Sequence, residues 1–199
     1  MSAWSDDDED DDGDAAVGDA GLLAVDRFSA LTRRVRWFAA LGRPFQQAER
    51  ETADAYLAEL GFVEAALAGI ADWEEAEGAA RNPDWNTAWW EAEEGQRMAL
   101  IAEACAVRAE AEVMDALSGL SAAASEASFQ AAGRALRRAG LDDEALARAA
   151  AGAATQAAYQ AGLVLLADAG PGHAFAHKFR LFESGRWPLG IVGTSFNVF

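Results

Sequence analysis

The two histidines of the chain stand four residues apart, in the segment HAFAH. On a helix, side chains at i and i+4 share a face, so His173 and His177 have a spacing with which two imidazoles can bind one metal ion. Iron, manganese or zinc would also need carboxylates from another helix, and Glu94 and Glu112 are candidates. However, the sequence has neither the Glu-x-x-His spacing of ferritin-like bundles nor an HExxH motif. A metal site is therefore an alternative to an ordinary pair at a helix start.

Other catalytic chemistry has little support in the sequence. The single cysteine, Cys105, lies on an apolar stripe between Ile101 and Ala109, where a thiol behaves as a small hydrophobe. No GxSxG elbow, Walker loop or GxGxxG fingerprint occurs, so serine hydrolysis and nucleotide binding are not indicated. We therefore assign no catalytic residue and no cofactor, and a non-enzymatic protein is favoured.

Tryptophans are concentrated in one part of the chain. Four of the seven lie between residues 73 and 90, namely Trp73, Trp85, Trp89 and Trp90. Aromatic side chains carry large apolar areas and often anchor interfaces. These residues therefore form either a partner-binding surface or the filling between helices.

The last 14 residues, RWPLGIVGTSFNVF, are uncharged after Arg186 and rich in residues that favour extended structure. We expect an extended C-terminal tail over residues 186–199. Such an apolar segment must be covered, either by its own helical domain or by a second subunit or partner. The candidate interaction residues in the tail are Trp187, Phe196, Val198 and Phe199.

The net charge of −17 is unevenly distributed. Residues 6–12 read DDDEDDD, and nine of the 33 acidic residues precede Ala20, which leaves 24 acidic against 16 basic residues in the remainder. We expect residues 1–18 to be a disordered acidic leader that keeps the protein in solution or docks on a basic partner. A surface of this sign repels nucleic acid and anionic lipid, so neither is an expected partner.

The remaining residues, 19–185, are rich in alanine and predict one helical domain. Six helices are expected, at about 19–41, 45–79, 82–119, 121–140, 142–169 and 173–184. The second and third would form a long antiparallel hairpin, with Asn82 as the cap between them. The fifth carries a face of small side chains that lets a helix of this chain or another chain approach closely: Ala147, Ala151, Ala154, Ala158 and Ala161.

The fold class is therefore all-α, a bundle of about six helices with an extended C-terminal tail. A single cysteine and an acidic N-terminus favour the cytoplasm, and the arginine and alanine bias favours a GC-rich bacterial source. The leading functional hypothesis is a non-enzymatic adaptor, assembly factor or oligomeric scaffold that binds a protein partner or itself. The alternatives are a metal-dependent helical-bundle oxidoreductase using His173 and His177, and an acidic mimic of nucleic acid.

Overall fold

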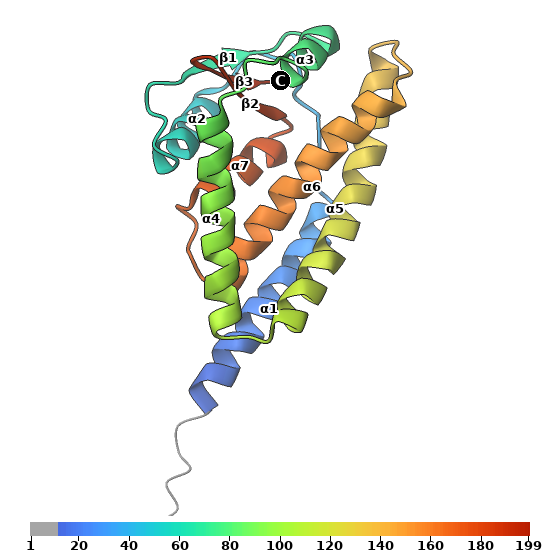
Figure 1. Cartoon of the computed structure of the whole chain (residues 1–199). Coiled ribbons are helices and arrows are strands. Elements are labelled where there is room, and N and C mark those ends of the chain that lie inside the picture. Colours follow the sequence, from blue (N-terminus) through green and yellow to red (C-terminus); the bar gives the residue numbers. More distant parts are fainter. Residues whose placement is uncertain (1–11) are drawn as a thin grey trace, which may run out of the picture.

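The computed structural model describes residues 12–199, and within them the chain is mostly helical with one small sheet (Figure 1). The predicted leader, residues 1–18, lies outside the described residues except for its last part, which belongs to the first helix. The elements are α1 (Asp12–Thr32), α2 (Gln47–Glu59), β1 (Ala66–Gly69), α3 (Trp73–Ala80), α4 (Thr87–Ala106), α5 (Glu110–Arg138), α6 (Glu144–Leu166), α7 (Ala174–Glu183), β2 (Pro188–Val192) and β3 (Ser195–Val198). The predicted helical class is therefore confirmed at the coarse level, with a sheet that the prediction lacked.

The longest helices, α5 and α6, form the main antiparallel pair, and α1 packs along both (Figure 1). All five alanines of the small face predicted on α6 are buried. Further along α6, Gly162 lies so close to α5 that an added Cβ would be 2.5 Å from Leu120 and 3.1 Å from Leu117. Small side chains let the two backbones approach, so the alanine-rich face packs within the chain.

The predicted helix over residues 45–79 is wrong. The structure divides this segment into α2, β1 and α3. Gly61 has φ +84°, a left-handed conformation that ends a helix and that glycine adopts without strain. β1 then pairs in parallel with β3, from Ala66 opposite Ser195 to Gly69 opposite Val198. The strand is thus formed by a partner more than a hundred residues away, which helical periodicity cannot reveal.

The predicted helix over residues 82–119 is also wrong in its bounds. Asn86 caps α4 by accepting a hydrogen bond from the Trp89 backbone N–H at 3.0 Å, whereas Asn82 accepts one from Asp84 in the preceding loop. A break after Ala106 separates α4 from α5, and Gly119 lies inside α5 with open space around it. The long antiparallel pair is consequently α5 with α6 and not the two earlier segments.

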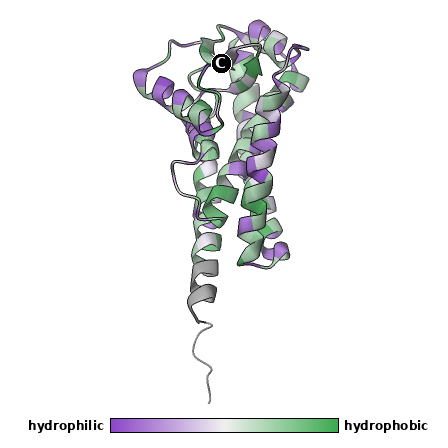
Figure 2. Cartoon of the chain, turned by 60° about the vertical axis from the view of Figure 1, so that its left-hand side comes forward, coloured by the Kyte–Doolittle hydropathy of each residue, from purple (hydrophilic) through white to green (hydrophobic). Residues whose placement is uncertain are grey.

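The C-terminal tail is extended, as predicted, and folds against its own chain. β2 and β3 form an antiparallel hairpin, and the sheet has the order β1-β3-β2. The C-terminus lies at the same end of the molecule as this sheet (Figure 2). Phe196, Val198 and Phe199 are each at most 2% exposed. The tail is therefore part of the core. None of the helices within residues 12–199 combines the length and the apolar content needed to cross a bilayer.

Candidate functional site: an apolar cleft and a buried polar cluster

The tryptophans and tail residues predicted to bind a partner are mostly interior. Trp73 and Trp187 lie in one core cluster with Phe199, and Trp89 lies in a second with Phe196. Trp85 is half-buried, and Trp90 is the one large exposed ring among the predicted set, at 58%. The sequence-predicted residues therefore do not assemble a broad exposed surface.

The histidines lie at the start of α7, as expected, but each has a local role. His173 is the N-cap, and its Nδ1 accepts a hydrogen bond from the Phe175 backbone N–H at 3.1 Å. The Nδ1 of His177 lies 3.1 Å from Nη1 of Arg180. Among residues 12–199, no group of three or more histidine, cysteine, aspartate or glutamate side chains is placed to hold a metal ion. The histidines thus find no further ligand in the described part of the chain.

Both histidines have a pKa below the ordinary value of 6.5. Partial burial is the largest cause in each case, and the charge of Arg180 lowers the pKa of His177 further. A folded-state pKa below the unfolded value means that the unfolded chain binds more protons as pH falls, so stability is lost below about pH 6.5.

We therefore expect the thermal midpoint of the protein to fall between pH 7.5 and pH 5.5. A variant with His173→Asn and His177→Gln should show a flatter profile over the same range, because asparagine keeps the helix cap but neither new side chain titrates. Thermal unfolding followed by circular dichroism measures both profiles. Equal slopes in the two proteins would show that the histidines do not cause the pH dependence.

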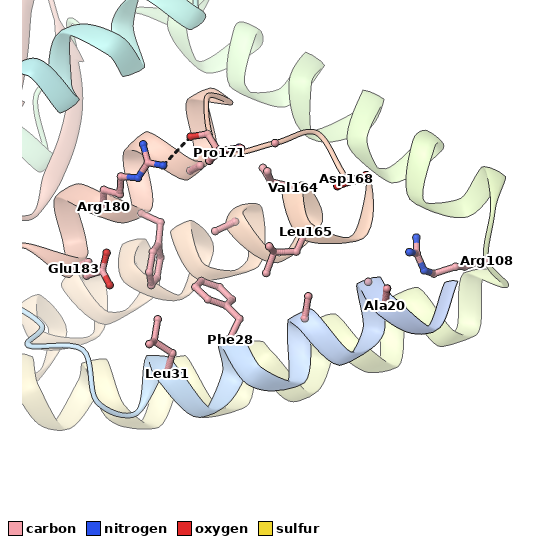
Figure 3. Close-up of a pocket in the computed structure, with 16 residues that line it drawn as sticks. Ala20, Phe28, Leu31, Arg108, Val164, Leu165, Asp168, Pro171, Arg180 and Glu183 are labelled. Carbon is pink, nitrogen blue, oxygen red and sulfur yellow. Dashed lines mark hydrogen bonds between the residues drawn. The ribbon is translucent and has the colours of Figure 1, made fainter. Parts of the chain in front are cut away.

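A cleft of about 700 Å³ opens between α1, the end of α6 and α7 (Figure 3). The α1 wall consists of residues spaced along one helical face, and α7 contributes the opposite wall. Phe28 of α1 and Phe179 of α7 meet edge to face in the cleft, with ring centroids 4.7 Å apart. The apolar residues of the lining are Ala20, Gly21, Ala24, Phe28, Leu31, Ala161, Val164, Leu165, Pro171, Ala176 and Phe179.

Charged side chains stand toward the ends of this cleft. Glu183 lies toward the Leu31 end, Arg180 lies beside Pro171, and Arg108 lies near Ala20 at the other end (Figure 3). The Arg180 Nη2 donates to the Pro171 carbonyl at 2.9 Å, which ties α7 to the preceding loop. Arg108 donates to the carbonyl of Leu166 at the end of α6. An apolar trough between charged ends suits an amphipathic ligand better than a polar one.

A second feature is a buried polar cluster that joins α2, α4 and α7. The Lys178 Nζ donates to both oxygens of Glu93, at 2.6 and 2.9 Å. The Tyr56 hydroxyl donates to Glu93 Oε1 at 2.6 Å and accepts from Trp89 Nε1 at 2.8 Å. All four residues are at most 6% exposed. Burial, followed by the charge of Glu93, raises the pKa of Tyr56 well above its usual range, so the hydroxyl stays protonated.

Neither the cleft nor the buried polar cluster was predicted from the sequence. Lys178 is the one lysine among 15 arginines and lies in the apolar run AFAHKFRLF, which is an unusual place for a charge. A single lysine in an apolar run predicts a buried ion pair, because lysine is almost never fully buried without a partner. The cleft had no comparable sign, since it depends on how α7 is placed beside α1.

Comparisons of the chain with protein-family models, with curated proteins and with solved structures gave no match. The function must therefore be argued from the sites themselves.

Proposed function

We propose that this chain is a non-enzymatic interaction protein, an adaptor or assembly factor, and that the α1–α7 cleft binds the apolar face of an amphipathic helix of a partner protein. The observation that carries the proposal is the cleft itself. It leaves one apolar face of α1 uncovered, and Leu31 on that face is 44% exposed. Large exposed apolar surfaces are costly in water and mark binding grooves.

The dimensions and the walls of the cleft favour a helix. Ala20 and Leu31 are eleven residues apart on α1, which corresponds to about 16 Å along the helix axis, or three turns of a bound helix. Small side chains on facing walls, Ala24 on α1 and Ala176 on α7, allow a helix backbone to approach closely, whereas Gly21 is covered by the Arg108 guanidinium. Apolar anchors at i, i+3 or i+4 and i+7 are the usual contacts of a helix in such a groove.

We expect Leu31→Asp to weaken partner binding at least about tenfold, because a carboxylate at this position removes an apolar contact and must be desolvated on binding. Leu23→Asp is the matched control. Leu23 lies on the same helix and is 53% exposed, but it does not line the cleft. Both variants should keep the thermal midpoint of the wild type, since neither leucine is buried. Titration calorimetry with the identified partner segment measures the difference.

The partner can be identified with a photo-crosslinking amino acid in place of Leu31, in the full chain, incubated with an extract of the source cells. The proposal expects one dominant product whose cross-linked peptide is an amphipathic helix. A synthetic peptide of that segment should then compete for cross-linking and bind less tightly to Leu31→Asp than to Leu23→Asp. Cross-linking to another copy of this chain, or a bound lipid found by native mass spectrometry, would contradict a separate helical partner.

A further inference from the structure

Another recess, of about 330 Å³, is lined by residues of α4, α6, α7 and β2 and shares no residue with the cleft. We call it the tryptophan pocket. Its aromatic wall includes Trp85, Trp89 and Trp90, and its polar groups are Glu93, Lys178 and Gln156. The proposed function uses none of these residues, so this pocket stands as an independent site.

The backbone of β2 positions the aromatic wall. Trp85 and Trp89 are stacked, with centroids 6.0 Å apart and planes inclined by 23°. Gly190 has φ +122°, and a Cβ at this position would lie 2.5 Å from the Trp85 ring and 2.7 Å from the Trp89 ring. Only glycine lets the strand pack directly on both indoles. Trp90, on the next position of α4, remains 58% exposed and leaves a ring free beside the pocket.

The polar side of the pocket has unused hydrogen-bonding capacity. Within residues 12–199, Lys178 donates hydrogen bonds to the two oxygens of Glu93, and its Nζ lies 5.8 Å from the centroid of the Trp89 ring, so one of its three ammonium N–H groups has no oxygen acceptor. Glu93 accepts three hydrogen bonds, two from Lys178 and one from Tyr56, of about four that a carboxylate can accept. One N–H donor of Lys178 and one acceptor position of Glu93 therefore remain available next to each other.

A hydroxyl group satisfies both at once, because it donates one hydrogen bond and accepts others. The ion pair as a whole is neutral, so the pocket favours neither an anion nor a cation. A planar aromatic ligand would stack on the indoles but would cover the ion pair without hydrogen-bonding to it, which is costly. A ligand with an apolar C–H face and a rim of hydroxyls fits both parts of the pocket. Its C–H face contacts the tryptophan rings, because the negative face of an indole attracts polarised C–H groups, and its hydroxyls bind the ion pair.

We propose that the tryptophan pocket binds a neutral sugar residue, whose C–H face stacks on Trp90 and whose hydroxyls bind Glu93, Lys178 and Gln156. The volume suits one such residue, at the lower end of the range for ligand sites.

The test is saturation-transfer NMR and titration calorimetry on the full chain. The probes are glucose, galactose, mannose, N-acetylglucosamine, maltose and cellobiose, with adenosine and indole as planar aromatic probes. We expect at least one saccharide to bind saturably, with Kd below about 1 mM, and the aromatic probes to bind more weakly. Trp90→Ala should weaken saccharide binding at least about tenfold, and Gln156→Ala should weaken it less.

The control variant is Phe129→Ala, which removes an exposed ring on α5 outside the pocket and should leave the affinity within about twofold. Because Trp90 is exposed, Trp90→Ala should retain the wild-type circular dichroism spectrum and thermal midpoint. Three results would overturn the proposal: no saccharide binds saturably, the affinity is unchanged in Trp90→Ala, or adenosine or indole binds through Trp90 while the saccharides do not.

Discussion

We expect Lys178→Met to lower the free energy of unfolding by about 3–5 kcal/mol, because it leaves the Glu93 carboxylate buried without its cation. The side chains of this pair are only 8% and 5% exposed, so a carboxylate left without its cation would be poorly hydrated. Tyr56 would still donate to Glu93, but one hydrogen bond from an uncharged hydroxyl does not offset the loss of an ammonium group that donates to both carboxylate oxygens. Urea unfolding at pH 7.5, followed by circular dichroism, measures the change.

The double variant Glu93→Gln with Lys178→Met is the decisive comparison. With both charges removed, most of the lost stability should return, because replacing a buried ion pair by uncharged groups of similar size is often neutral. The exposed pair Arg148–Glu144 offers a matched control, and Arg148→Met should change the stability little. A double variant as unstable as Lys178→Met would show that packing of the lysine stem, and not the buried charge, carries the effect.

The second large effect is expected at Arg186, which is 2% exposed. Its guanidinium donates to both carboxylate oxygens of Glu49, at 3.0 and 2.8 Å. It also donates to the carbonyls of Ala40, Arg43 and Pro44, at 2.6 to 2.9 Å. One side chain thereby fixes the loop before α2 and the start of α2 to the chain entering β2.

We expect Arg186→Met to destabilise the protein by about 3–5 kcal/mol, because it leaves a buried carboxylate and three carbonyl groups without their donor. Arg186→Lys should recover only part of the lost stability, since an ammonium group cannot reproduce the planar arrangement of N–H donors in a guanidinium group. Urea unfolding of both variants is the measurement. Wild-type stability in Arg186→Lys would show that the positive charge alone matters and that the geometry of the guanidinium donors does not.

The pH dependence gives an independent check. Burial alone raises the pKa of Glu49, but hydrogen bonds and charge from Arg186, with the Gln46 N–H, hold it below its ordinary value of 4.5. A lowered folded-state pKa contributes stability that is present above the unfolded pKa and is lost as pH falls below it. The difference between wild type and Arg186→Met should therefore shrink below about pH 4.5.

Local sequence patterns predicted the features that depend on neighbouring residues. A glycine just after a helical pattern is typical of a helix end, and Gly140 and Gly185 both have positive φ just after α5 and α7. The extended character of the last residues was also readable, because β-branched and aromatic residues are concentrated there. These features need no knowledge of distant contacts.

Features that depend on distant residues could not be predicted in this way. The segment around Leu67 has apolar spacing compatible with a helix and becomes a strand because β3 pairs with it. Nothing near Glu93 in the sequence marks it as buried, because its partner Lys178 lies 85 residues further along the chain. The cleft beside Leu31 likewise arises from the packing of three helices, so the sequence of any one of these helices does not predict it.

The parallel pairing of β1 with β3 also has a consequence for the order of events during synthesis. β1 emerges from the ribosome long before β3, and it lies at the edge of the sheet, paired with β3 alone among the strands of residues 12–199. Residues 66–69 must therefore wait, unpaired, while α4 to α7 are translated, since a strand cannot complete its ladder before its partner exists. The nascent chain is most open to aggregation or to chaperone capture during this interval.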